Sequence, residues 1–554
     1  MQKYWFLIIS LMLFFSSFAI AETNDPEANG TDTKDKQQQT IADNSTQNTK
    51  ASASSKAEEK PTFDIMEYEV VGNSVLAKEK IEEAVYDFMG EAKTIDDVEK
   101  ARAALEKTYQ DAGFLTVSIN IPQQDVDKGI VKLEVLEGRV ERLRVKDAHY
   151  YSLGVIKERV PEFAEGNVPN FTKAAQQLAT VNRGANRQVA PILRPGKSPG
   201  KVEIDLKVQD QIPLHGSLEL NDKYSANTTE TRLNGSVRYE NLWQRDHSIS
   251  LSFQVSPQNT SEVKVLSGTY LIPTLAGDYF AAYGVISRSN IAAVGDVNVI
   301  GNGNIIGLRY IHPLPQAEGY YHTMTLGADY KDFKESVILL GADGFKTPIA
   351  YSAFSATYDG TYQAEQFQTQ ASAGVSFGVR GLGNKEREFA DKRFLAKPNF
   401  AALHTDIKHL QKLPYSWALQ AQVSGQLTDA PLISAEQFAV GGADSVRGYY
   451  ESNSLGDSGY WASLELRTPS LNKYIKQSFK ELYAYSFVDG GYVKTYNALS
   501  GQIPSNHLLS TGLGIKLKAE KGLYADLDYA HVLQTAGQVK NGDDRLHFKL
   551  GYEW

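Results

Sequence analysis

The side chains that could carry chemistry do not form a catalytic or metal-binding set. The chain has 554 residues and no cysteine, which excludes thiolate nucleophiles, thiolate metal sites and disulfides. Its ten histidines include no His-Glu-x-x-His spacing, and no Gly-x-Ser-x-Gly marks a serine nucleophile. Gly196-Lys197-Ser198 ends like a phosphate-binding loop, but Pro191 stands where that loop requires its first glycine. We therefore predict no enzyme activity, no metal and no cofactor.

Two short motifs in the last quarter of the chain offer a different chemistry, the pairing of a guanidinium with a carboxylate. They are Ser445-Val446-Arg447-Gly448-Tyr449 and Phe487-Val488-Asp489-Gly490-Gly491. Arg447 has a planar fork of donors that suits a carboxylate, and Gly448 permits a backbone turn that a residue with a Cβ resists. Taken singly, Arg447 could be an ordinary loop arginine and Asp489 an ordinary turn acid. Their meaning therefore depends on the elements that carry them.

The beginning of the chain has the pattern of an export signal. Lys3 precedes the apolar run of residues 4–18, and Ala19-Ile20-Ala21 follows as a small-residue cleavage site. The run is too short for a transmembrane anchor, which needs about 20 apolar residues. We predict a signal peptide at residues 1–21 and, because residues 22–60 contain no aromatic residue and many polar ones, a flexible polar linker after it. A short helix within the linker is the alternative.

The overall composition excludes two further classes of protein. The net charge is −9 and the isoelectric point is near 5.7, so the basic footprint of a nucleic-acid-binding protein is absent. Mean hydropathy is −0.36, and after residue 21 no apolar run is long enough for a membrane-spanning helix. A β-barrel is then the remaining way for this chain to cross a membrane.

Residues 61–210 have the pattern of two small α+β domains in tandem. A strand from residue 63 to 71 precedes two amphipathic helices at 78–89 and 94–112, for which Thr94 and Asp97 form a capping box and Gly113 a stop. Two strands follow, at 115–121 and 130–135. The same order recurs as a strand at 140–145, helices at 151–160 and 171–182, and strands at 188–193 and 202–208. We place the domain boundaries at 61–139 and 140–210.

Residues 211–554 alternate apolar and polar side chains in short segments separated by Gly, Asn and Asp. The last segment is the clearest, because Leu546, Phe548, Leu550, Tyr552 and Trp554 alternate with polar residues or glycine. A soluble β-sandwich has the same period, but all except six of the 30 tyrosines follow residue 213, and tyrosine suits membrane interfaces. We predict a transmembrane antiparallel β-barrel of about 16 strands, at about 10 residues a strand plus turns and loops.

Several of these motifs resemble one family. Gly113-Phe114, Ile121-Pro122-Gln123-Gln124, the run from Gly129 to Val135 and Glu137-Gly138-Arg139-Val140 are similar to the POTRA domain of two-partner secretion transporters, the hemolysin secretion and activation type. Pro195-Gly196 with Gly200 is similar to the end of that family's second POTRA domain. The resemblance covers residues 63–554 and implies two POTRA domains followed by a barrel.

The resemblance also gives the two guanidinium and carboxylate motifs a role. Residues 438–449 match the family's long extracellular loop, whose tip folds back into the barrel, and residues 487–491 match the inner-wall motif whose aspartate receives the arginine. The resemblance thus implies that Arg447 and Asp489 pair, that Ser445, Val446, Gly448 and Tyr449 shape the tip, and that Phe487 and Gly491 seat it. A plug helix near the mature N-terminus is another family feature, but residues 22–60 have no strong amphipathic pattern.

The function implied is secretion through the outer membrane of a Gram-negative bacterium, with the POTRA domains in the periplasm. The expected partner is one large secreted exoprotein of the hemolysin, adhesin or contact-dependent toxin type, together with outer-membrane lipid and the barrel-assembly machinery that inserts the chain. A candidate client-binding edge is Thr116, Val117, Ser118, Ile119 and Asn120. The alternatives are a factor that inserts other barrels, which usually has more POTRA domains, and a passive pore, which needs none.

Overall fold

The computed structural model describes residues 61–554, apart from residues 127, 183, 185, 275, 290, 295–296, 301, 335, 338–344 and 476–478. The chain divides into Met1–Pro61 and Thr62–Trp554, and all elements described below belong to the second unit. The expected signal peptide and polar linker, residues 1–21 and 22–60, lie outside the described residues. Within the described ranges, no helix is both long and apolar enough to span a membrane.

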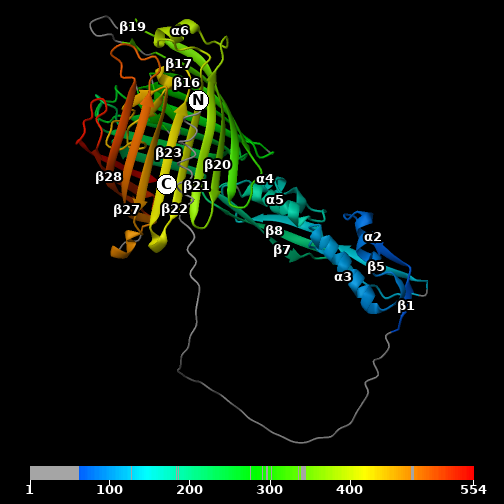
Figure 1. Ribbon diagram of the computed structural model, residues 1–554. Helices are drawn as coiled ribbons and strands as arrows, with labels where there is room; N and C mark the ends of the chain where they lie inside the picture. Colours follow the sequence, from blue (N-terminus) through cyan, green and yellow to red (C-terminus); the bar gives the residue numbers. More distant parts are fainter. Residues whose placement is uncertain are drawn as a thin grey trace, which may run out of the picture. The chain divides into compact units, whose positions relative to one another are not determined.

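The first α+β domain has a three-stranded sheet in the order β2-β5-β4, with β2 parallel to β5 and β4 antiparallel to it. Its core contains Ile65, Val98, Leu105 and Leu133, which are at most 1% exposed. The elements are β1 Phe63–Ile65, β2 Glu67–Val71, α2 Lys78–Tyr86, β3 Gly90–Lys93, α3 Ile95–Asp111, β4 Val117–Asn120 and β5 Ile130–Glu137 (Figure 1).

The single strand predicted from residue 63 is wrong, because two strands occupy that stretch. β1 pairs with β3, which the sequence analysis did not predict, whereas β2 belongs to the main sheet. The chain changes sheets at Met66, whose backbone N–H donates to the Gly129 carbonyl at 2.7 Å. β3 has only four residues and one apolar side chain, so it lacks the alternation that marks a half-buried strand.

The predicted start of the long helix α3 is confirmed. Asp97 accepts hydrogen bonds from the backbone N–H of Thr94 at 3.0 Å and from its hydroxyl at 2.9 Å. The backbone bond from Thr94 is the main reason that the pKa of Asp97 is lowered to about 2. Val98, Ala101, Leu105 and Tyr109 then face the core at helical spacing.

The second α+β domain repeats the predicted order of elements. Its sheet has the order β6-β8-β7, with β6 parallel and β7 antiparallel to β8, and helices α4 and α5 pack on one face. The elements are β6 Arg139–Lys146, α4 Leu153–Glu158, η1 Pro161–Phe163, α5 Phe171–Val181, β7 Arg187–Pro195 and β8 Lys201–Asp210.

The two α+β domains meet where α3 ends and α5 begins. Asn170 caps α5 by accepting from the backbone N–H of Lys173 at 3.1 Å, and its side-chain amide donates to the Ala112 carbonyl at 2.9 Å. The backbone N–H of Phe171 donates to the Gly113 carbonyl at 2.8 Å, and Val168 packs into the core of the first domain. Backbone groups that have no hydrogen-bond partner within their own helix, at the end of α3 and the start of α5, are therefore paired across the junction.

The rest of the chain closes into an antiparallel barrel of sixteen strands, as predicted (Figure 1). In sequence order these are β9 Leu214–Asn221, β10 Arg232–Leu242, β11 His247–Val255, β12 Lys264–Pro273, β13 Tyr279–Arg288, β16 Gly303–Pro313, β17 Tyr320–Phe333, β20 Ile349–Gln363, β21 Phe367–Gly378, β22 Ala401–Lys412, β23 Ala418–Leu427, β26 Ser458–Arg467, β27 Glu481–Lys494, β28 Ser505–Lys518, β29 Leu523–Val532 and β30 Asp544–Glu553.

Shorter elements lie in the connections between barrel strands. They are β14 Ile291–Val294, β15 Val297–Ile300, β18 Ser336–Val337, β19 Phe345–Lys346, α6 Glu386–Lys392, η2 Pro414–Ser416, η3 Ser434–Glu436, β24 Phe438–Val440, β25 Ser454–Gly456 and η4 Leu471–Tyr474. Of these, β24 and β25 pair with each other and carry the segment that contains Arg447.

The outer surface of the barrel carries the apolar side of the alternation. Leu546, Leu550 and Tyr552 on β30 and Trp554 directly after it are about half exposed, and the register sets Leu550 beside Leu220 and Tyr552 beside Leu218 on β9. The pairs that alternate with these are Lys549 with Asn221, Gly551 with Glu219 and Glu553 with Ser217. Apolar outside and polar inside is the arrangement that a lipid-facing barrel with a wet lumen requires.

The junction between the α+β domains gives the first prediction. We expect Asn170→Ala to lower the stability of that junction by about 1–2 kcal/mol, because it removes a helix cap and a hydrogen bond between domains. Amide exchange of the full chain, followed by mass spectrometry, should then show about 5- to 30-fold faster opening around residues 170–174. Thr180→Ala on the exposed part of α5 is the control; equal protection in both variants would contradict the role assigned to Asn170.

Candidate functional site

The loop tip, residues 441–453, lies inside the barrel at the end of a short stem formed by β24 and β25. Val446 and Tyr449 are fully buried, and Arg447 is 5% exposed. Gly448 has φ +93°, and a Cβ at this position would come within 2.9 Å of Val532 Cγ2 on the opposing wall. The turn and the close approach both require glycine here.

Arg447 and Asp489 are in direct contact. Arg447 Nε donates to Asp489 Oδ2 at 2.7 Å, its Nη2 donates to Oδ1 at 2.8 Å, and its backbone N–H donates to Oδ2 at 3.1 Å. Asp489, on β27, is fully buried. This geometry joins the two motifs by three charge-assisted hydrogen bonds.

The other groups that surround the guanidinium could not be recognised from the two motifs. Nη1 donates to Glu465 on β26 at 3.0 Å and is 3.7 Å from Asp528 on β29. The ring of Phe487 lies 3.5 Å from the guanidinium carbon. Glu465 and Asp528 alternate with outward apolar residues, so their inward direction could be predicted, but their distance from Arg447 depends on the register of neighbouring strands.

The remaining motif residues pack the loop tip against the wall. The Tyr449 hydroxyl donates to the Gln534 carbonyl at 2.5 Å and accepts from the Leu509 backbone N–H at 3.1 Å. Ser445 Oγ accepts from the backbone N–H of Gly441 at 3.0 Å. A Cβ at Gly491 would come within 2.5 Å of Val440 and 3.1 Å of Val446, so the missing side chain makes room for the loop.

A second buried carboxylate, which the sequence analysis also missed, fixes the base of the stem. Asp457 directly follows β25, is fully buried and accepts from the backbone N–H of Leu432 at 2.9 Å. It also pairs with Arg393, which follows α6, at 2.8 Å. Nothing in the local sequence distinguishes Asp457 from a surface turn residue, because all of these partners are distant along the chain.

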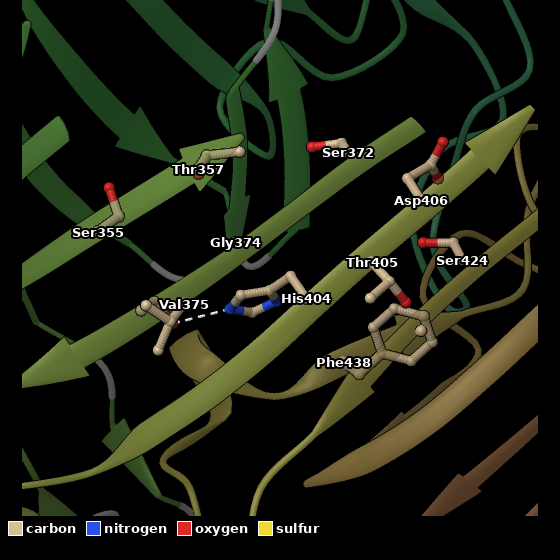
Figure 2. Close-up of a pocket in the computed structure, with 12 residues that line it drawn as sticks. Ser355, Thr357, Ser372, Gly374, Val375, His404, Thr405, Asp406, Ser424 and Phe438 are labelled. Carbon is tan, nitrogen blue, oxygen red and sulfur yellow. Dashed lines mark hydrogen bonds between the residues drawn. The ribbon is translucent and has the colours of Figure 1, made fainter. Parts of the chain in front are cut away.

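The wall beside the stem is lined by small polar side chains. A cavity of about 210 Å³ lies over β20, β21, β22 and β23, and Phe438 of the stem borders it (Figure 2). Its lining includes Ser355, Thr357, Ser372, Gly374, Ser376, His404, Asp406 and Ser424, with His404 Nε2 and Ser376 Oγ at 2.8 Å. This part of the lumen combines hydrogen-bonding groups with apolar surface.

The proposed client-binding edge is β4, which borders the sheet of the first α+β domain. Val117 and Ile119 point into the core, whereas Ser118 and Asn120 are exposed. Thr116 precedes the strand, and its hydroxyl donates to the Gly138 carbonyl at 3.0 Å. Four of the five expected residues therefore lie on the edge strand, and Thr116 contacts the linker to the second domain.

Known proteins match most of the chain. The family model described as haemolysin secretion/activation protein ShlB/FhaC/HecB matches residues 200–517, and that of the ShlB-type POTRA domain matches residues 63–138. The heme/hemopexin transporter protein HuxB of Haemophilus influenzae (strain 86-028NP) is 20% identical over 82% of this chain and 80% of its own length. The outer membrane transporter CdiB of Dickeya dadantii is 23% identical over 33% of this chain and 32% of its own.

Solved structures share the fold. CdiB from Escherichia coli has a TM-score of 0.61 at 17% identity, covering 91% of this chain and 93% of its own. BamA from Haemophilus ducreyi, in a form lacking POTRA domains 1–3, has a TM-score of 0.55 at 12% identity, covering 89% and 100%.

The buried ion pair predicts that the loop tip is held in the lumen by Asp489. Because the chain has no cysteine, Val446→Cys is a clean probe of that position. We expect a membrane-impermeant maleimide to label it slowly, and severalfold faster when Asp489→Ala is added, since removing one partner of a buried pair costs about 3–5 kcal/mol. Asp329→Ala, which breaks a pair with Arg309 elsewhere on the wall, is the matched control. Equal labelling rates with Asp489→Ala and with the control would exclude this anchor.

Proposed function

The chain belongs to the haemolysin secretion/activation protein family ShlB/FhaC/HecB, and from that premise we propose that it carries one large exoprotein through its barrel to the cell surface. It is an outer-membrane transporter with periplasmic POTRA domains. The observation that carries the proposed mechanism is the buried contact of Arg447 with Asp489, which holds a loop inside a sixteen-strand lumen. A client of the hemolysin, adhesin or contact-dependent toxin type fits this arrangement.

Capture begins at the edge strand β4. An extended client adds to such an edge as one more strand, so main-chain hydrogen bonds supply affinity without demanding one sequence. The exposed Ser118 and Asn120 side chains leave this edge open on its solvent face, while Val117 and Ile119 anchor it to the core. An unfolded client is therefore bound while its side chains remain variable.

Passage then follows a polar route. The side chains that line the cavity over β20–β23 are mostly small, and several carry hydroxyl groups, so an extended chain meets groups that exchange hydrogen bonds with it as water does. No nucleotide is required, because folding outside removes the unfolded form and pulls the transport equilibrium outward. The half-exposed apolar belt of the barrel meets outer-membrane lipid, and the barrel-assembly machinery is the proposed partner for its insertion.

The loop tip that Arg447 anchors is an obstacle on this route that can be moved aside. The loop tip fills part of the lumen, and its position depends on a charged anchor rather than on apolar burial alone. Water entering with the client weakens an ion pair much more than it weakens packing, because the attraction between charges falls as the local dielectric rises. The loop is thus held firmly while the pair is buried, and it is released when the client brings water to Arg447 and Asp489.

The charge reversal Asp489→Arg tests this proposal. We expect it to lower the amount of one large exoprotein in the medium and on the cell surface by about tenfold or more, because two guanidinium groups then face each other in a buried site and the loop cannot return to its held position between transport events. Adding Arg447→Asp should restore only part of that amount, since Glu465 and Asp528 repel the new carboxylate. Comparative mass spectrometry of strains with and without the gene identifies the exoprotein and supplies the reference.

Asp329→Arg, in the Arg309 pair on β16 and β17, is the control for reversing a charge in the lumen. Wild-type secretion by Asp489→Arg would remove the proposed role of the pair. A parallel fall of many outer-membrane barrels on deletion of the gene would favour an assembly factor instead. No change in any surface protein on deletion would favour a passive pore.

The capture step has its own test. A photo-crosslinking amino acid at Ser118, on the β4 edge, should give an adduct with the client in secreting cells. The same amino acid at Glu69 should not, although Glu69 is exposed on the opposite edge strand β2 of the same sheet. Adducts of equal yield at both positions would show that the β4 edge has no special role in binding.

A further inference from the structure

The closing seam of the barrel, between β9 and β30, is its shortest strand pairing. Five residue pairs join these strands, from Lys549 with Asn221 to Glu553 with Ser217. Every other pair of neighbouring barrel strands has eight to fourteen. Backbone hydrogen bonds between Gly216 and Trp554 and from Asp222 to Phe548 extend this pairing by one position at each end. Beyond Asp222, other contacts must keep the two strands together.

Asp222 supplies the first of these contacts with its side chain. Oδ1 accepts from the backbone N–H of Phe548 at 2.8 Å, and Oδ2 lies 2.9 Å from Nδ1 of His547. Both residues are almost completely buried, Asp222 at 6% and His547 at 4% exposure. The backbone N–H of Asp222 also donates to the Phe548 carbonyl at 3.3 Å, so the carboxylate reinforces the ladder at its last backbone bond.

The loop tip reaches the same place. The backbone N–H of Gly448 donates to Nε2 of His547 at 2.9 Å. Because that N–H can only donate, Nε2 is unprotonated, and the ring proton lies on Nδ1 and is donated to Asp222. Gly448 is therefore held through His547 and Asp222 to both sides of the seam, while the adjacent Arg447 is held to β27.

Three further contacts connect the loop tip to the seam. Lys223, after β9, pairs with Asp444 of the loop at 2.5 Å, and the backbone N–H of Glu451 donates to the Tyr224 carbonyl at 3.0 Å. Arg545 of β30 lies over the rings of Tyr224 and Tyr450, at 5.1 Å and 3.9 Å. The loop thus contacts the chain that follows β9 and also β30.

We infer that Asp222 and His547 form a positioning site that fastens the loop tip to the closing seam, so that release of the loop loosens the seam. The purpose of this coupling rests on the proposed function, because a looser seam widens the path for a client. The physical basis of the coupling does not rest on the proposed function. The loop and the two weakly paired strands share one anchor, so breaking that anchor loosens all three together.

Cysteines placed on paired residues of the seam measure its closure. Leu220 and Leu550 are register partners, and paired strand residues are close enough for a disulfide. In Leu220→Cys/Leu550→Cys, oxidised in isolated outer membranes, we expect His547→Ala to lower the disulfide yield severalfold. His547→Gln should preserve most of the yield, because its amide can still accept from Gly448 and donate to Asp222.

His531→Ala is the matched control, since His531 forms a comparable pair with Asp544 at 2.7 Å but is 42% exposed, and it should leave the yield unchanged. Arg447→Ala should lower the yield as His547→Ala does, and combining the two should add little, because both variants release the same loop. Heat-modifiable migration in gels verifies that each barrel is folded.

An unchanged yield in folded His547→Ala, or an equal fall in His531→Ala, would overturn the positioning role. Loss of yield with Arg447→Ala that simply adds to that of His547→Ala would overturn the coupling. Secretion measured in the same strains separates the two proposals. If the disulfide yield changes as expected but the protein secretes nothing, only the proposed function is contradicted. If the yield does not change in a protein that secretes, only this inference is contradicted.

Discussion

A guanidinium buried inside the barrel is the constraint on which the rest of the structure depends. Arg447 cannot lose its proton, so its burial has to be compensated by carboxylates and by every available acceptor. Asp489 takes two of its N–H groups, Glu465 takes another, and Ser463 shares Nη2. These residues lie on β26 and β27, which pair with each other in the barrel wall. The Arg447 side chain can therefore be satisfied only if these two strands pair in the correct register.

The same arginine leaves an excess of negative charge around it, and the wall compensates for that excess in turn. Asp528 accepts from the Tyr485 hydroxyl at 2.5 Å, and Glu465 pairs with Arg467 at 3.0 Å. The network therefore extends from the loop to three strands of the wall, β26, β27 and β29. Such networks specify one arrangement strongly, because a partly satisfied member costs more than an apolar replacement would.

The sequence predicts the parts of this architecture that depend on local pattern. Helical spacing located α3 and α5 to within about two residues, which is the usual uncertainty of element boundaries, and the alternation of Leu546, Leu550 and Tyr552 predicted the outward face of β30. It failed for β3, which is short and polar, and for α6, whose seven residues contain two apolar side chains. The number of strands was predicted from the length of the segment, because the individual strands could not be counted from the sequence.

Partners that meet only when the barrel closes could not be predicted in the same way. Arg447 and Asp489 were paired through their motifs, but Asp222 and His547 are separated by most of the barrel sequence and become neighbours because β9 pairs with β30. Their pairing depends on strand number and register together, neither of which one strand encodes.

Closure also explains why the loop anchor should be polar. An apolar plug would be held by contact area, which changes little until the plug has moved away, whereas ion pairs and hydrogen bonds respond at once to water and to competing groups. A transporter whose lumen must alternate between sealed and occupied states needs that second kind of contact, and Arg447, Gly448 and His547 provide it at one point.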